Sequence, residues 1–324
     1  MTQAYLDELS AQLGGLGVRG GRRRRILAET EDHLRSDPGA TQRFGDPAEI
    51  AQAFANDLGT AGALRAPLWA FAALAVSGIF YGAMYLAWSG FVVSNGQTAV
   101  RSASGVVQTL ASAKPPWLGL LATAVLVLAP QVAFVTGVLA LMRALRLHGR
   151  SSVPAAEVQV LRRRTATAIA SGLATVGALA LFAQQFSAQL PSWSSGVLGW
   201  GVVGAVASAM VLVACGAAGL RTATVRVAVP GSAGDLFDDL GPVVPAPLRG
   251  RPWAIAVTAS CGLGLLVWFA GIAASDPYDG ALRGIAEGAA SFIGFIVLGR
   301  FLALRSHHPG IRSAVVERTH QPGR

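Results

Sequence analysis

Long apolar stretches alternate with short, arginine-bearing connections along most of the chain. The first stretch runs from Leu64 to Trp88, and its single charged side chain, Arg65, stands at the leading edge. At a rise of about 1.5 Å per residue, the residues from Pro67 to Trp88 would span about 33 Å as a helix. That length matches the hydrocarbon core of a bilayer, so the pattern predicts a membrane-spanning helix.

The same apolar pattern recurs five more times, which predicts an all-α, polytopic membrane protein with six transmembrane helices. Composition supports this class, because 52% of the residues are hydrophobic and 13% are charged, whereas soluble domains carry about 25% charged residues. The expected spans lie near residues 67–90, 117–142, 166–188, 196–220, 253–274 and 282–304.

Basic residues divide unequally between the two sides that six spans would create. Of the 26 lysines and arginines, all but Arg101, Lys114 and Arg283 fall before the first span, in the second or fourth connection, or at the C-terminal end. The positive-inside rule therefore predicts a multi-pass cell-membrane protein with a cytosolic N-terminus and a cytosolic C-terminus. This distribution explains the net charge of +9, so we expect the lipid bilayer as the arginines' partner and no direct binding of nucleic acid.

The first 62 residues are polar and predict a cytosolic domain of three short helices, with no signal peptide. In the first helix, Leu6, Leu9 and Leu13 form one apolar stripe. The third helix begins at Asp46-Pro47, a pair that is typical of a helix N-terminus. A core of about 60 residues is marginal, so we expect this domain to dock onto a partner or the membrane.

Three groups of residues in this region resemble the HAAS-type signalling domain, also described as a permease prefix domain of bacterial membrane proteins. They are Tyr5-Leu6 with Leu9 and Leu13, Arg25-Ile26-Leu27 with Glu29, His33 and Leu34, and Phe44-Gly45-Asp46-Pro47 with Ile50-Ala51. The resemblance covers residues 3–60 and implies a cytosolic helical domain that precedes membrane helices and has a signalling role. Genes of that family often neighbour a PadR-like transcription regulator, so such a regulator is an implied partner. The glycine-rich first turn and the run of four arginines depart from the family pattern.

The connections predict little regular structure. Residues 91–116 are rich in Ser, Gly and Gln and predict a modest loop or a short surface helix. In the longest inner connection, 221–252, residues 232–240 predict a short interfacial helix. The last residues, 305–324, contain histidines, prolines and glycines and predict a disordered cytosolic tail.

The densest charge in the chain is a run of four arginines at the start of the second expected helix. Such a run is a candidate for binding anionic lipid headgroups or an acidic face of a partner protein. The alternative is a solvated helix start that also keeps the N-terminus in the cytosol. The four residues are Arg22, Arg23, Arg24 and Arg25.

Two carboxylates complete the set of candidate site residues. Glu29 and His33 lie one helical turn apart, and because the domain has no other histidine we favour a local hydrogen bond that packs the bundle over a metal site.

Glu287 is the only carboxylate well inside an apolar stretch, with Arg283 one turn away. This pair predicts either an outward-facing polar pocket for a cation or ligand, or a salt bridge near the membrane interface.

Small residues recur four apart within two spans, at Gly284 and Gly288 and at Gly204 and Ser208. This spacing lets helices approach closely, and we favour packing within the chain over the alternative, a homodimer interface. The two cysteines lie singly inside apolar stretches and form neither a disulfide pattern nor a zinc pattern.

The function that these patterns favour is a membrane-embedded signalling or regulatory protein whose N-terminal domain binds a cytosolic partner. The alternative is a permease-like membrane subunit of a transporter that works with a separate ATPase, because the chain has no Walker-type glycine loop. An intramembrane enzyme is disfavoured, since the spans hold no paired carboxylates, no His-Glu-x-x-His motif and no Ser/Lys dyad. No cofactor and no metal are expected.

Overall fold

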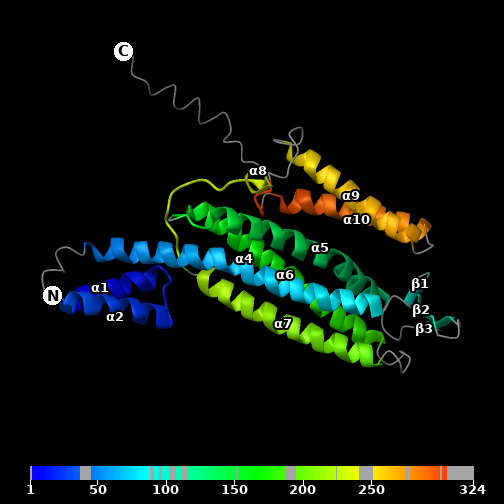
Figure 1. Cartoon of the computed structure of the whole chain (residues 1–324), viewed down its shortest axis with the longest axis horizontal. Coiled ribbons are helices and arrows are strands. Elements are labelled where there is room, and N and C mark those ends of the chain that lie inside the picture. The colour runs from blue at the N-terminus through cyan, green and yellow to red at the C-terminus, as the bar shows by residue number, and fades with distance from the viewer. Residues whose placement is uncertain are drawn as a thin grey trace, which may run out of the picture. The chain divides into compact units, whose positions relative to one another are not determined.

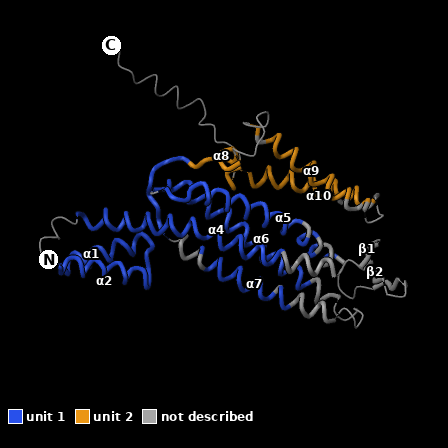
Figure 2. The backbone as a smooth tube through the Cα atoms, in the orientation of Figure 1, with its two compact units in different colours: residues 1–232 blue, residues 233–324 orange. Residues whose placement is uncertain are grey.

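The computed structural model of the chain is helical almost throughout, which confirms the helical class. Its residues divide into two compact units, residues 1–232 and residues 233–324, coloured blue and orange in Figure 2. The structure describes residues 2–36, 45–87, 91–94, 97–101, 107–110, 116–150, 152–186, 195–223, 225–240, 251–273, 277–299 and 301–304. The predicted tail, residues 305–324, lies outside these described residues.

The first unit holds two N-terminal helices and a bundle of four long helices. In Figure 1, α1 and α2 lie beside the first part of α4, and α1 packs against both. Helices α4, α5, α6 and α7 run alongside one another, with α5 and α6 in closest association. The helices are α1 (Thr2–Gly15), α2 (Gly20–Ser36), α4 (Pro47–Ala87), α5 (Pro116–Leu147), α6 (Ala155–Phe186) and α7 (Ser195–Ala223).

Helix α4 joins two elements that the sequence analysis treats as separate. It runs for 41 residues from Pro47 to Ala87, so the third helix of the expected N-terminal domain and the first expected span are one helix. The expected domain boundary at residue 62 therefore lies inside a helix. Alanine-rich sequence on both sides of Arg65 favours the helical state. Pro67 lies within the helix, where it cannot donate a backbone hydrogen bond and its ring crowds the carbonyl group of residue 63.

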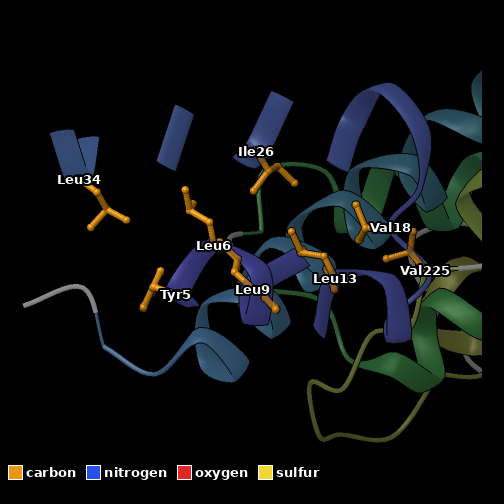
Figure 3. Packing of buried hydrophobic residues seen from close by; sticks show 10 residues of the cluster. Tyr5, Leu6, Leu9, Leu13, Val18, Ile26, Leu34 and Val225 are labelled. Carbon is orange, nitrogen blue, oxygen red and sulfur yellow. The ribbon is translucent and has the colours of Figure 1, made fainter. Parts of the chain in front are cut away.

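A hydrophobic core joins the N-terminal helices to α4. Leu9 and Leu13 are fully buried, as the predicted stripe on the first helix requires (Figure 3). Their neighbours on α4 are Ala51 and Ala55, which are also fully buried and let α1 approach the α4 backbone closely. The predicted start of α4 is confirmed, because the Ala48 backbone N–H donates to Asp46 Oδ1 at 3.1 Å.

Three short strands occupy the connection between α4 and α5. They are β1 (Phe91–Ser94), β2 (Gln97–Arg101) and β3 (Val107–Leu110), paired antiparallel in the order β1-β2-β3. The register pairs Val92 with Ala99 and Ala99 with Thr109. The expectation of a short surface helix here is wrong, because Val and Thr recur along these residues and Asn-Gly separates the first two strands, a pair that favours a hairpin.

Four helical stretches among the described residues are long and apolar enough to cross a membrane. They are Pro47–Gly78, Ala124–Leu147, Ala155–Leu181 and Gly280–Leu298. Val206–Ala217 and Trp253–Phe269 are shorter apolar helices at the positions of the fourth and fifth expected spans. The chain is therefore a helical protein with helices suited to a membrane. The full count of six spans and the side of each terminus stay predictions.

The second unit contains α8 (Leu236–Leu240) and an antiparallel pair, α9 (Pro252–Ala273) and α10 (Pro277–Leu298). Helix α8 is shorter than expected and is capped by Asp235, whose Oδ1 accepts a hydrogen bond from the Phe237 backbone N–H at 2.9 Å. Helices α9 and α10 approach at glycines: a Cβ on Gly264 would lie 2.7 Å from the carbonyl oxygen of Gly284, and one on Gly288 would lie 3.0 Å from that of Ser260. Packing within the chain is thus confirmed for Gly284 and Gly288.

Candidate functional site

A short extended segment after α7, residues 225–229, connects the N-terminal helices to the bundle, and we call it the strap. The Arg226 backbone N–H donates to the carbonyl oxygen of Leu16, in the turn between α1 and α2, at 3.0 Å. The Ala228 backbone N–H donates to Asn56 Oδ1 of α4 at 2.9 Å, and Gln52 Nε2 of α4 donates to the Arg226 carbonyl oxygen at 3.3 Å. One segment is thereby bonded to α4 and to the α1–α2 turn.

The strap also bonds to α6. Arg162 Nη2 donates to the Val225 carbonyl oxygen at 3.1 Å. The backbone N–H of Ala155, the first residue of α6, donates to the Val229 carbonyl oxygen at 2.9 Å. Because extended backbone offers polar groups on both edges, five residues can bond two helices and a turn at once.

Side chains of the strap alternate between buried and exposed, as in a strand. Val225 is 3% exposed and belongs to the core formed with Leu9 and Leu13 (Figure 3). Val227 packs on a second apolar cluster, around Leu147 and Leu161 of the α5–α6 pair. The two valines therefore link the core of the N-terminal helices to the core at this end of the bundle.

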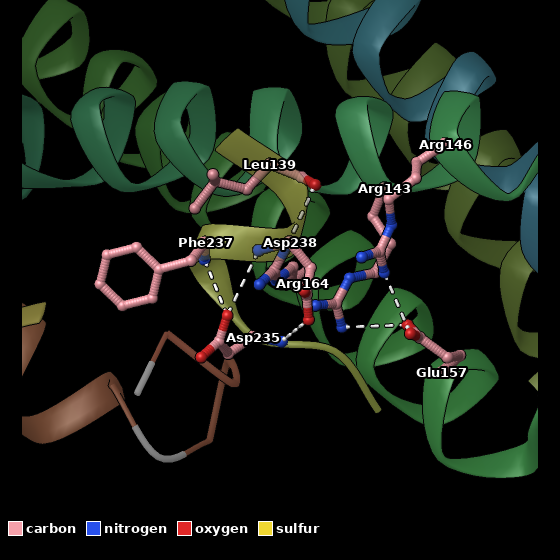
Figure 4. A network of polar contacts seen from close by, with 8 residues as sticks. All are labelled: Leu139, Arg143, Arg146, Glu157, Arg164, Asp235, Phe237 and Asp238. Atoms are coloured by element: carbon pink, nitrogen blue, oxygen red, sulfur yellow. Dashed lines mark hydrogen bonds and ion pairs between the residues drawn. The ribbon is translucent and has the colours of Figure 1, made fainter. Parts of the chain in front are cut away.

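A buried ionic network lies where α5 and α6 meet (Figure 4). Glu157 Oε2 lies 3.4 Å from Arg143 Nη1, and Glu157 Oε1 lies 3.0 Å from Arg146 Nη2. Arg164 Nη1 donates to the carbonyl oxygen of Leu139 at 3.1 Å. Arg143 and Arg164 are completely buried, so these arginines hold the ends of α5 and α6 together.

Sequence reasoning missed this network. The expected role of the arginines was only to fix orientation, and Glu157 was not among the candidates. A signal was present, because Glu157 is the only acidic residue in the arginine-rich stretch 143–165. A lone carboxylate among many arginines is a natural ion-pair partner, but which arginines it meets depends on how α5 and α6 pack.

The run of four arginines does not form one uniform surface. Arg23 is half-buried and donates from Nε to Ser10 Oγ at 3.0 Å, which ties α2 to α1. Arg25 pairs with Glu29 at 2.8 Å on the exposed face of α2, and this hydrogen bond raises the pKa of the Arg25 guanidinium. Arg22 and Arg24 are exposed. Two of the four arginines are therefore available to a partner on the surface.

Glu29 and His33 are both exposed, and Glu29 accepts a hydrogen bond from Arg25. Both side chains therefore lie outside the core, to which α2 contributes Ile26, Thr30 and Leu34. The local hydrogen bond expected between Glu29 and His33 stays a prediction. No group of three or more His, Cys, Asp or Glu side chains that could hold a metal occurs in the described part of the chain.

Glu287 is half-buried on α10, and the side chain of Arg283 lies outside the described residues. A groove of about 750 Å³ between α9 and α10 is lined by small and apolar side chains, among them Cys261, Trp268 and Phe292, and Glu287 is not part of its lining. The polar pocket and the salt bridge at Glu287 both stay predictions.

The fold and this site define a class: a helical protein with apolar helices suited to a membrane. Its N-terminal helices α1 and α2, with the first turns of α4, form a small helical module that the strap bonds to one end of the bundle. No protein-family model matches the chain, and no curated protein or solved structure matches it.

Proposed function

We propose that this chain is a membrane-embedded regulatory protein whose N-terminal helices bind a cytosolic protein and pass that event to the bundle. The observation that supports this proposal is the strap, which begins directly after α7 and is bonded to the α1–α2 turn, to α4 and to α6. The resemblance of residues 3–60 to a HAAS-type signalling domain supports the same assignment.

The proposed arrangement in the membrane has six spans, with both termini in the cytosol. The distribution of arginines supports it. Four of the six expected spans overlap helical stretches that are long and apolar enough to cross a bilayer. The module of α1, α2 and the first turns of α4 then stands on the cytosolic side, where a soluble protein can reach it.

The proposed coupling is mechanical. If a partner displaces α1 and α2 relative to α4, then either the bond from Arg226 to Leu16 breaks or the strap follows the displacement. Since the strap also bonds Arg162 and Ala155, a moving strap carries the displacement to the start of α6. Because these hydrogen bonds break or move together, the strap has two discrete arrangements, one with all of its bonds in place and one displaced, as a switch requires.

Photo-crosslinking in living cells tests the proposal. A photoreactive residue replaces Ala11 of α1 or Ala28 of α2, both exposed, and a matched control replaces Met210 of α7, which is 63% exposed on an apolar helix. We expect a protein adduct from positions 11 and 28 and none from position 210. We also expect binding of that protein to the purified full chain to change hydrogen exchange at the Arg226 and Ala228 amides.

A chain that yields no protein adduct from any exposed position of α1 and α2 would contradict the proposal. An adduct without any change at the strap amides would contradict the coupling step. An ATPase captured from the exposed Arg150 position in the α5–α6 turn would favour the transporter alternative instead.

A further inference from the structure

The N-terminal helices have one end close to the bundle and one end far from it. At the near end, the α1–α2 turn bonds the strap through Leu16. At the far end, the Tyr5 hydroxyl donates to the Gly45 carbonyl oxygen at 3.4 Å, just before α4 begins. Figure 3 shows the same order, with Tyr5 and Leu34 at one side of the core and Val225 at the other. Helix α2 therefore begins at the near end and finishes at the far end.

Helix α4 indicates where the membrane surface lies relative to this near end. Arg65 is exposed, and Trp69, one turn further on, is 65% exposed, a combination typical of a membrane interface. The rise from Asn56, which bonds the strap, to Arg65 is about 14 Å. The headgroup region on one side of the bilayer accounts for about 5 to 8 Å of this rise. The distance that remains between the headgroups and the strap is therefore about one Debye length, which is about 8 Å.

Exposed arginines gather at this near end. Arg19 lies in the α1–α2 turn, Arg22 and Arg24 lie in the first turns of α2, and Arg226 lies on the strap. Arg150 is exposed in the α5–α6 turn, close in sequence to the Ala155 that bonds the strap. Within the described residues, none of these five guanidinium groups has a hydrogen bond or an ion pair. We call Arg19, Arg22, Arg24 and Arg226 the arginine end.

Exposed carboxylates of the N-terminal helices lie mostly at the opposite end. Among the described residues the exceptions are few: Asp57 is exposed near the strap, Glu29 is paired with Arg25 at 2.8 Å midway along α2, and Arg35 at the far end is paired with Glu31 at 2.6 Å. The helical module is thus polarised along its length, with positive charge toward the bundle. The exposed carboxylates at the far end are Asp7, Glu8, Glu31, Asp32, Asp46 and Glu49.

We propose that the arginine end binds anionic lipid headgroups of the same membrane that holds the bundle. Charge complementarity and distance both favour this occupant, because an anionic headgroup layer carries the opposite charge and attracts basic residues within about a Debye length. The acidic far end is directed away from the same surface. The inference rests on the proposed cytosolic position of the N-terminal helices.

The test uses the full chain in vesicles of phosphatidylcholine alone and in vesicles of phosphatidylcholine mixed with phosphatidylglycerol. Hydrogen exchange is measured over the α1–α2 turn and the start of α2. We expect exchange to slow about tenfold in the anionic vesicles, since contacts with headgroups must break before this turn opens, and we expect high salt to reverse the effect.

Arg22→Gln with Arg24→Gln should abolish the difference between the two kinds of vesicle. Both side chains are exposed and make no hydrogen bond or ion pair with the described residues, so we expect the variant to keep its fold. The matched control, Arg35→Gln, changes an exposed arginine at the far end of the same helix and should leave the difference intact. The inference would be overturned if the full chain exchanged equally fast in both kinds of vesicle. It would also be overturned if the arginine-end variant and Arg35→Gln lost the difference between the vesicles to the same extent.

The failure of this inference is distinguishable from failure of the proposed function. Protein adducts from positions 11 and 28 with no effect of lipid charge would remove only the lipid contact and would leave the partner-binding proposal standing. A lipid effect without adducts would remove only the partner-binding proposal.

Discussion

Gly59 of α4 lies directly against Val227 of the strap. A Cβ at position 59 would come within 2.5 Å of Val227 Cγ2, which is closer than side-chain carbons approach. A glycine in the middle of a helix is ordinarily unfavourable by about 0.5 to 1 kcal/mol relative to alanine. Its presence here lets the strap pack against the α4 backbone.

Gly59→Ala should therefore loosen the strap although alanine is the better helix former. Val227 is β-branched and has little rotamer freedom, so the strap must move to relieve the contact. We expect faster hydrogen exchange at the Arg226 and Ala228 amides and a lower melting temperature. Gly78→Ala is the matched control on the same helix, because a Cβ there meets nothing within 4 Å. Equal behaviour of the two variants would contradict the role of Gly59.

Glu157→Gln should be among the most destabilising polar substitutions in this chain. It removes the charge that Arg143 and Arg146 share, and Arg143 is completely buried. Breaking a buried ion pair costs about 3 to 5 kcal/mol. Glu31→Gln breaks the exposed pair with Arg35 and should cost at most about 1 kcal/mol. Thermal unfolding in detergent compares the two, and similar melting temperatures would refute the network's importance.

Arg23 and Ser10 should be coupled in a double-mutant cycle. Each single alanine variant removes the same contact between α2 and α1, so the double variant should lose no more stability than one of them. The expected loss is about 1 kcal/mol. Arg24→Ala, the exposed neighbour, should leave the melting temperature unchanged. Additive losses in the cycle would mean that the two side chains act independently.

Gly264→Ala should disrupt the α9–α10 pair. The added Cβ would meet the Gly284 carbonyl oxygen at 2.7 Å, and a backbone atom in a helix cannot move aside by itself. Overpacking of this kind costs about 1 to 3 kcal/mol. Gly262→Ala lies two residues away with nothing within 4 Å of its Cβ and serves as the control. The measurement is resistance of the two variants to detergent-induced unfolding, where only Gly264→Ala should lose stability.

The N-terminal helices should lose stability at alkaline pH because the Tyr5 hydroxyl ionises. Burial raises the pKa of its hydroxyl above the model-compound value of 10.0, and the nearby Asp46 and Glu8 carboxylates raise it further. A raised pKa means that the stabilisation is complete below pH 10 and is lost as the pH rises through the folded-state pKa. A phenolate titration of the full chain, with Tyr5→Phe subtracted, should show this late ionisation. A Tyr5 that ionises at or below pH 10 would contradict the prediction.

Local pattern was sufficient for several features of this protein. The Leu9–Leu13 stripe, the cap at Asp46 and the apolar stretches depend on residues within one or two helical turns of one another, so their periodicity and spacing are visible in the sequence. The length of an apolar stretch likewise decides by itself whether a helix can cross a bilayer.

Tertiary structure decided the rest, because the deciding contacts join residues far apart in the chain. Nothing local relates Leu16 to Arg226 or Gly59 to Val227, and each contact exists only because α7 returns the chain to the N-terminal helices. The unbroken course of α4 through residue 62 also depends on packing, since both sides of that point favour a helix and no local signal says whether one helix or two will form. Helix periodicity specifies which face is apolar, whereas the partner of that face is chosen by the packing of the whole unit.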